Sequence, residues 1–203
     1  MMRETIDKAL SEAISYPDYR SLIDHLLGAG KTTGTDHDEN MLYYTQLNVA
    51  RMNKWDKRFE LSHAASEVLK EINKDEIWLV LTEAWCGDAA HALPVLAKME
   101  RASAAIDLKI VLRDEHTELM NQFLTNGARS IPKLIRLDAR GHKVLDTWGP
   151  RPAELTALFQ KLKGEEQPPE DIKKQLQIWY ARNRGRAIEN EIASMLMQKA
   201  HYS

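Results

Sequence analysis

Two adjoining stretches decide the fold, Ile77-Trp78-Leu79-Val80-Leu81 and, four residues later, Trp85-Cys86-Gly87-Asp88-Ala89. The first is a continuous apolar run, which predicts a strand buried on both faces of a sheet. The second opens a helix expected over residues 89–104. Cys86, the only cysteine of the chain, therefore lies at a helix N-terminus. Unpaired N–H groups and the helix dipole favour a negatively charged thiolate there.

The pattern around these stretches alternates strands and helices from residue 76 onward. The order β-α-β-α-β-β-α predicts an α/β domain, with a parallel sheet that ends in an antiparallel hairpin. The expected strands cover residues 77–81, 108–112, 133–137 and 142–148, and the expected helices cover residues 89–104, 115–126 and 152–163.

Helical segments flank this α/β region on both sides. Residues 1–75 read as a helical N-terminal extension, residues 76–163 as the core domain, and residues 164–203 as a linker and a C-terminal helix. The first extension is expected to hold several amphipathic helices, with Gly28 capping one of them. A single long helix is predicted from Glu170 to His201. The extensions could cover a sheet edge or form a homodimer interface.

Composition sets limits on the class of protein. The chain has 203 residues, a net charge of −2 and 43% hydrophobic residues, which is ordinary for a globular protein. No basic face points to nucleic acid, and no apolar stretch reaches the roughly 20 residues that span a bilayer. The N-terminus lacks the apolar core of a signal peptide. A single cysteine excludes an internal disulfide, so we expect a cytoplasmic protein with a reduced thiol.

Three loop motifs together resemble the thioredoxin superfamily. The first is Trp85-Cys86-Gly87 at a strand-to-helix junction, with Pro94 eight residues after the cysteine. The second is Ile131-Pro132 before the third strand, and the third is Gly149 after the hairpin. The resemblance implies a thioredoxin-like fold, in which a four-stranded mixed sheet is flanked by helices. It also implies a cis-proline at Pro132 that faces Cys86.

The residue sequences of these motifs also resemble those of a bacterial branch of thioredoxin-like proteins that has helical extensions at both ends. In this chain Trp85-Cys86-Gly87-Asp88-Ala89 replaces the Cys-x-x-Cys motif, so Ala89 stands where the resolving cysteine belongs. Val80 stands where many thioredoxins bury an aspartate that helps to move protons. The chain therefore lacks both residues that are specific to the dithiol cycle.

These residues imply a thiol-disulfide oxidoreductase with one active thiol, acting on protein or small-molecule disulfides. Cys86 would be the nucleophile, and an external small thiol or a partner would release the mixed disulfide. No cofactor, metal, nucleic acid or membrane is implied. The alternative is a non-catalytic module that binds a peptide or protein in the same groove. The groove would be formed by Trp85, Gly87, Asp88, Ala89, Ile131, Pro132 and Gly149.

Several interpretations stay open at this level. Cys86 could be a buried small hydrophobe, although its motif favours an exposed, reactive thiol. Asp88 stabilises the helix start but opposes ionisation of a neighbouring thiol, and Arg129 could offset that charge. Residues 28–33 only partly match a phosphate-binding loop. Residues 36–39 could hold a metal ion, but acidic residues before a helix more often cap it.

Overall fold

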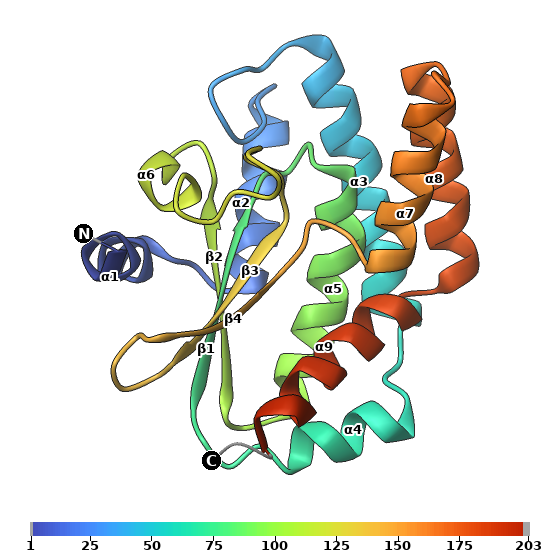
Figure 1. Ribbon diagram of the computed structural model, residues 1–203. Helices are drawn as coiled ribbons and strands as arrows, with labels where there is room; N and C mark the ends of the chain where they lie inside the picture. The colour runs from blue at the N-terminus through green and yellow to red at the C-terminus, as the bar shows by residue number, and fades with distance from the viewer. Residues whose placement is uncertain (1, 201–203) are drawn as a thin grey trace.

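A mixed four-stranded sheet forms the centre of the computed structural model, which describes residues 2–200 except for the side chains of residues 198–200. The strand order is β2-β1-β3-β4 (Figure 1). The predicted α/β class, a four-stranded mixed sheet flanked by helices, is confirmed. The strands are β1 (Glu76–Thr82), β2 (Ile106–Leu112), β3 (Lys133–Asp138) and β4 (Val144–Trp148).

Strand direction differs from the sequence prediction at β3. Strands β1 and β2 are parallel, but β3 is antiparallel to β1, and β4 is antiparallel to β3. The reason is the connection between β2 and β3. Its only helix, α6 (Thr117–Met120), has one turn and rises about 6 Å, whereas a return along the sheet needs about 20 Å. The chain therefore re-enters the sheet at the end where β2 stopped.

The helix expected over residues 115–126 is therefore shorter in the structure, where only Thr117–Met120 are helical. Beyond Met120 the chain turns, and Asn126 and Gly127 both have positive φ angles, of 50° and 77°. A left-handed pair of this kind cannot continue an α-helix. The sequence signal was the Asn-Gly pair, which favours a turn.

Helices cover both faces of the sheet. In Figure 1, α1 and α6 lie on one side, while α3, α5, α7, α8 and α9 lie on the other, with α5 against the sheet. Their bounds are α1 (Met2–Glu12), α2 (Tyr16–Gly28), α3 (Glu39–Arg58), α4 (His63–Lys70), α5 (Gly87–Arg101), α7 (Ala153–Gly164), α8 (Pro169–Asn183) and α9 (Arg186–Ala200). None of the helices in the described residues is long and apolar enough to cross a membrane.

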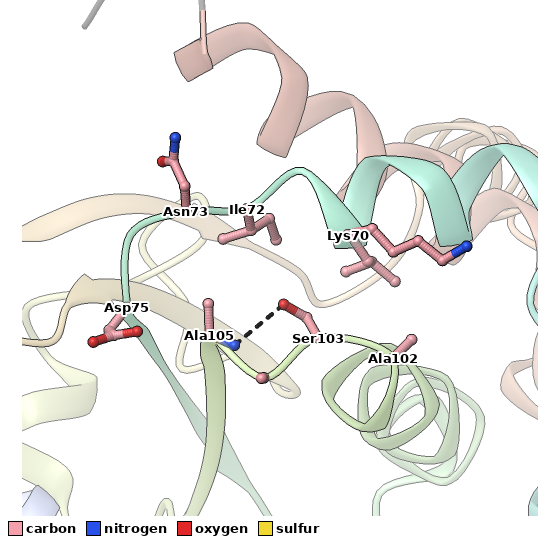
Figure 2. Close-up of a pocket in the computed structure, with 9 residues that line it drawn as sticks. Lys70, Ile72, Asn73, Asp75, Ala102, Ser103 and Ala105 are labelled. Carbon is pink, nitrogen blue, oxygen red and sulfur yellow. Dashed lines mark hydrogen bonds between the residues drawn. The ribbon is translucent and has the colours of Figure 1, made fainter.

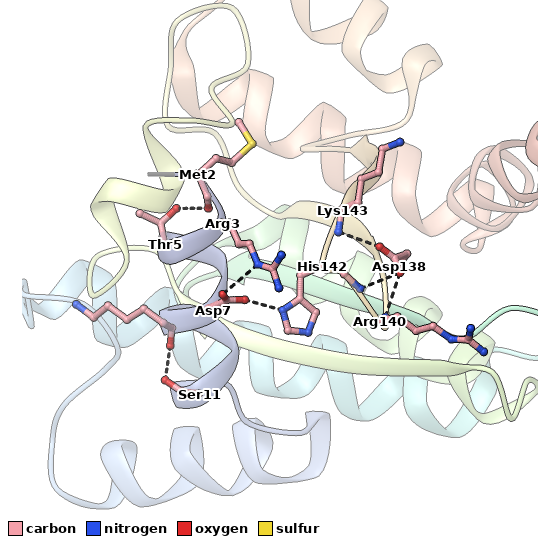
Figure 3. Close-up of polar contacts among 11 residues, drawn as sticks. Met2, Arg3, Thr5, Asp7, Ser11, Asp138, Arg140, His142 and Lys143 are labelled. Atoms are coloured by element: carbon pink, nitrogen blue, oxygen red, sulfur yellow. Dashed lines mark hydrogen bonds and ion pairs between the residues drawn. The ribbon is translucent and has the colours of Figure 1, made fainter.

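The N-terminal extension covers the free edge of β2. Ile14, between α1 and α2, exchanges two backbone hydrogen bonds with Ile110, of 2.9 and 2.8 Å. Figure 3 shows a second attachment, in which Asp7 of α1 contacts His142 of the β3–β4 turn at 2.6 Å. The bonds between Ile14 and Ile110 satisfy backbone groups that the edge of β2 would otherwise expose. Gly28 is the last residue of α2, and the cap is Ala29 rather than Gly28.

The C-terminal extension is two helices, not the single long helix that was predicted. Arg184 and Gly185 have φ angles of 56° and 78°, which end α8 and redirect the chain into α9. A Cβ atom at Gly185 would lie 2.9 Å from the Phe59 ring, so the turn packs tightly against the N-terminal extension. The glycine at position 185 was the signal for this break. His201, the predicted end of the helix, lies outside the described residues.

Candidate functional site

Cys86 is the residue before the first turn of α5, at the carboxyl end of β1. Its backbone is extended, with φ −77° and ψ 113°, and its N–H donates to the Glu83 carbonyl at 3.1 Å. Two residues of the N-terminal extension hold the same loop. Thr33 Oγ1 accepts from the Ala84 N–H at 2.8 Å, and Asn48 Nδ2 donates to the Ala84 carbonyl at 2.8 Å. The extension therefore fixes the loop that carries the thiol.

The thiol faces the loop before β3. Cys86 Sγ donates a hydrogen bond of 3.2 Å to the Ile131 carbonyl oxygen, and the Ile131–Pro132 peptide bond is cis. Gly149, whose φ angle is +112°, lies directly behind this loop. A Cβ atom at Gly149 would come within 2.2 Å of the Pro132 carbonyl oxygen, which leaves no space for a side chain. The structure thus brings together Cys86, Ile131, Pro132 and Gly149. The Gly149–Pro150 bond is also cis.

Burial of the thiol corrects the sequence expectation that Cys86 is exposed. Cys86 is only 9% exposed. Burial, followed by the negative charge of Asp88, raises the pKa of Cys86 to about 12. The backbone N–H groups of Ala89 and Asp88 and the charge of Arg151 act in the opposite direction but do not offset burial. At neutral pH the resting thiol is therefore protonated.

An ion pair lies beside the thiol on the first turn of α5. Asp88 Oδ2 is 2.7 Å from a guanidinium nitrogen of Arg151, and the Tyr180 hydroxyl donates to Asp88 Oδ1 at 2.9 Å. Arg151 follows Pro150 in the loop before α7, and Tyr180 comes from α8. The cation that meets Asp88 is therefore Arg151, not Arg129, whose Nε donates to Asn121 instead.

Both extensions close the helix start from the sides. A Cβ atom at Gly87 would lie 3.5 Å from Arg51 Nη1 of α3 and 3.6 Å from Gln177 Nε2 of α8. His91, one turn further along α5, accepts from Trp55 Nε1 and contacts Gln177 Oε1, both at 2.8 Å. Burial lowers the pKa of His91 to about 4, so the ring is neutral. His91 therefore supports the packing behind the thiol.

A buried carboxyl group that the sequence reasoning missed lies three residues before the thiol. Glu83 has no exposed surface, and its Oε1 accepts from the Asp114 N–H at 2.9 Å. Burial raises the pKa of Glu83. Val80, by contrast, is fully buried in β1, so the position of the missing aspartate is apolar. Trp85 is partly buried and carries the Arg113 guanidinium over its ring at 4.9 Å.

The remaining polar motifs have structural partners. Thr32 Oγ1 lies 2.6 Å from Thr45 Oγ1, and Thr33 holds Ala84, so the residues that resemble a phosphate-binding loop support the site loop instead. Asp38 caps α3 by accepting from the Met41 N–H at 2.7 Å. Among the described residues, no group of three or more His, Cys, Asp or Glu side chains is arranged to hold a metal ion.

A surface pocket of about 410 Å³ lies away from the thiol (Figure 2). It is formed where α4 and α5 end and β1 and β2 begin, which is the end of the sheet opposite to Cys86. Ser103 Oγ in this pocket already accepts from the Ala105 N–H at 3.4 Å. The pocket lining is Leu69, Lys70, Ile72, Asn73, Asp75 and Ala102 to Ala105.

A family model described as thioredoxin matches residues 34–163, more than half of the chain. The chain belongs to the thioredoxin family. The match begins within the N-terminal extension, so α3 and α4 fall inside the segment that this chain shares with the family. No curated protein sequence matches the chain.

Two solved structures have a fold similar to that of this protein over nearly the whole chain. A protein of unknown function from Pseudomonas aeruginosa has a TM-score of 0.57 at 18% identity, covering 92% of this chain and 99% of its own. An HIV epitope scaffold has a TM-score of 0.56 at 19% identity, covering 91% of this chain and 99% of its own. At these identities the likeness concerns the fold alone.

Proposed function

We propose that this thioredoxin-family protein is a thiol-disulfide oxidoreductase that works with one thiol, Cys86, on protein or low-molecular-weight disulfides. The observation that supports the proposal most directly is the contact between Cys86 Sγ and the Ile131 carbonyl. Because of this contact, the only thiol of the chain lies beside backbone groups with which an extended disulfide-containing segment can pair.

The first step is attack by the Cys86 thiolate on a substrate disulfide. The thiol first loses its proton to solvent, and the sulfur then bonds to one substrate sulfur while the other leaves as a thiolate. Deprotonation also removes the hydrogen bond to the Ile131 carbonyl, which becomes available to a substrate N–H. Within the described part of the chain, the Ile131 N–H has no hydrogen-bond partner, so both backbone groups can receive an extended segment.

The second step needs an external thiol, because residue 89 is alanine. One external thiolate attacks the Cys86 sulfur of the mixed disulfide and releases the substrate thiol. A second external thiolate then attacks the new adduct and regenerates Cys86. In total, one substrate disulfide and two external thiols yield two substrate thiols and one external disulfide. A small cellular thiol or a partner protein can fill this role.

A second candidate is a binding module that uses the same groove without chemistry. The observation that favours it is the buried, protonated state of Cys86. A protonated thiol is a poor nucleophile, because the thiolate is the reactive form. The two candidates differ in one measurable respect. Exchange of a disulfide requires the sulfur, whereas binding of a peptide in the groove does not.

Turnover of a protein disulfide with and without a small thiol separates these candidates. The oxidoreductase proposal predicts slow reduction when a small thiol is present, faster at alkaline pH, and no reduction above the small-thiol background with Cys86→Ser. Peptide binding without any Cys86-dependent reduction would support the binding module instead. Sustained reduction of the protein disulfide with an added thioredoxin reductase but no small thiol would contradict the one-thiol mechanism, since residue 89 provides no second thiol.

A further inference from the structure

The ion pair beside Cys86 is built into the fold. Its carboxylate comes from the first turn of α5 and its guanidinium from the loop before α7. The two side chains are only 11% and 20% exposed, for Asp88 and Arg151 respectively. The Arg151 guanidinium also lies over the Phe159 ring at 4.5 Å. Two contacts, with Asp88 and with Phe159, therefore hold a positive charge at the start of the helix that contains the thiol.

Arg151 retains an unused hydrogen-bond donor at this position. Its Nε is buried and has no partner in the described residues. A buried donor without an acceptor is costly, so such a group gains most from an anion that forms nearby. Of the groups around the helix start, Cys86 is the one that gains a negative charge in the proposed reaction. Asp88 already has its charge, shared with Arg151 and the Tyr180 hydroxyl.

We propose that Arg151 is a positioning residue for Cys86. Asp88 anchors the Arg151 guanidinium at the start of α5, and the part of the positive charge that Asp88 does not neutralise determines how readily Cys86 ionises. The inference rests on the proposed function, because it concerns the control of that same thiol. Asp88 has two opposed effects. It keeps Arg151 in place, and its negative charge neutralises most of the positive charge that would otherwise favour the Cys86 thiolate.

Other polar groups face the site from each neighbouring element. Burial raises the pKa of Asp88, and the positive charge of Arg51 of α3 acts in the opposite direction. Tyr180 stacks on the neutral His91 ring at a centroid distance of 4.0 Å. Tyr19 of α2 is fully buried and remains protonated, because burial raises its pKa. The groups to consider in any pH profile are therefore Tyr19, Arg51, Glu83, Asp88, His91, Arg151 and Tyr180.

The chain contains a second trio of the same types, which offers a matched control. Asp56 of α3 pairs with Arg20 of α2, and the Tyr16 hydroxyl donates to Asp56 at 3.0 Å. The side-chain exposures of Arg20 and Asp56 are 14% and 29%. Neither residue is among the main causes of the raised pKa of Cys86. Changes in this trio test the general cost of losing such a pair.

The test is the pH dependence of Cys86 ionisation, measured in two ways. Alkylation by iodoacetamide reports Cys86 alone, because the chain has one cysteine. Ultraviolet absorbance of the thiolate, taken as the difference from Cys86→Ser, follows ionisation without requiring access by a reagent. The variants are Asp88→Asn, Arg151→Met and Arg151→Lys, with Asp56→Asn as the control. Thermal melting verifies that each variant is folded at the temperature of the measurement.

Asp88→Asn is expected to lower the ionisation midpoint by about one pH unit, which raises the thiolate fraction roughly 10-fold at a fixed pH below that midpoint. Arg151→Met should shift the midpoint upward, Arg151→Lys should restore most of the shift, and Asp56→Asn should leave it unchanged. An unchanged midpoint in both Asp88→Asn and Arg151→Met would overturn the proposal, as would an equal shift in Asp56→Asn. Neither readout involves a disulfide, so a failure of the oxidoreductase proposal gives a different result: shifted midpoints without any mixed disulfide.

Discussion

Cys86 Sγ and the Ile131 carbonyl oxygen are 3.2 Å apart, and the thiol is the donor. This contact joins the start of α5 to the loop that precedes β3, two segments that are 45 residues apart in the sequence. It also holds the proton on the sulfur, in agreement with the burial that raises the pKa of Cys86 to about 12. The resting thiol is therefore protected, and its reactivity depends on deprotonation.

The first prediction concerns the rate of alkylation of Cys86 as a function of pH. Because the thiolate is the reactive form, the rate should rise about tenfold for each pH unit. No plateau is expected below pH about 11, since the pKa is about 12. Iodoacetamide labelling followed by mass spectrometry measures this rate. A plateau near pH 8 or 9 would show a thiol with ordinary ionisation.

The second prediction concerns stability at alkaline pH. The folded pKa of Cys86 lies above the ordinary value of 9.0, so the folded state holds the proton more tightly than the unfolded state. The resulting contribution to stability is complete below pH about 9 and is lost as the pH rises toward 12. Urea unfolding at several pH values should therefore show a steeper loss for the wild type than for Cys86→Ala. Tyr16, Tyr19 and Tyr180 are common to both proteins, so their ionisation cancels in the comparison.

Ala89→Cys should create a pair of thiols that oxidises to an internal disulfide. Residue 89 lies in the first turn of α5, three positions after Cys86, where side chains are neighbours about 5–6 Å apart at Cβ. Mild oxidant followed by mass spectrometry under denaturing conditions detects the loss of two hydrogen atoms, whose electrons pass to the oxidant. Ala92→Cys is the matched control, because Ala92 is also a buried alanine of α5 but is six positions from Cys86. Two free thiols in Ala89→Cys after oxidation would contradict the described helix start.

Gly149→Ala should disturb the groove from behind. A φ angle of +112° disfavours alanine, and its Cβ would meet the Pro132 carbonyl oxygen at 2.2 Å. Strain and clash together should cost roughly 1–3 kcal/mol of the free energy of unfolding. Thermal or urea unfolding measures this loss. Gly28→Ala is the control, because a Cβ there meets nothing within 4 Å and the residue is helical, so its effect should be neutral or stabilising by about 0.5–1 kcal/mol.

The sequence was most informative where local patterns determine structure. The apolar run at 77–81 and the Trp85-Cys86-Gly87 junction correctly predicted a buried strand that leads into the helix with the thiol. The direction of β3 was not predicted correctly, because the pattern at 115–126 indicated a helix of several turns. The actual helix has one turn and is too short to return the chain along the sheet. The break at Gly185 had a local signal, the glycine itself, within an otherwise helical pattern.

The surroundings of the thiol could not be predicted from motif spacing, because they depend on contacts between residues that are far apart in the sequence. Arg151 and Tyr180 reach Asp88 from segments 63 and 92 residues away in the sequence. Their arrival depends on how α7 and α8 pack, which local periodicity does not specify. The same holds for the burial of Cys86, since Arg51 and Gln177 of the two extensions close the helix start. The sequence could name the nucleophile candidate but not its state of ionisation.

The role of Cys86 as the nucleophile is tested by mass spectrometry of the mixed disulfide. The folded protein is incubated at pH about 9 with a disulfide-linked peptide and then treated with a small thiol. The one-thiol mechanism predicts one peptide adduct per chain on Cys86, released by the thiol and absent in Cys86→Ser. The urea-unfolded chain serves as the control that the peptide disulfide is reactive. If the unfolded chain forms the adduct while the folded protein does not, even at pH about 10 with prolonged incubation, Cys86 is a buried structural thiol and the oxidoreductase proposal is wrong.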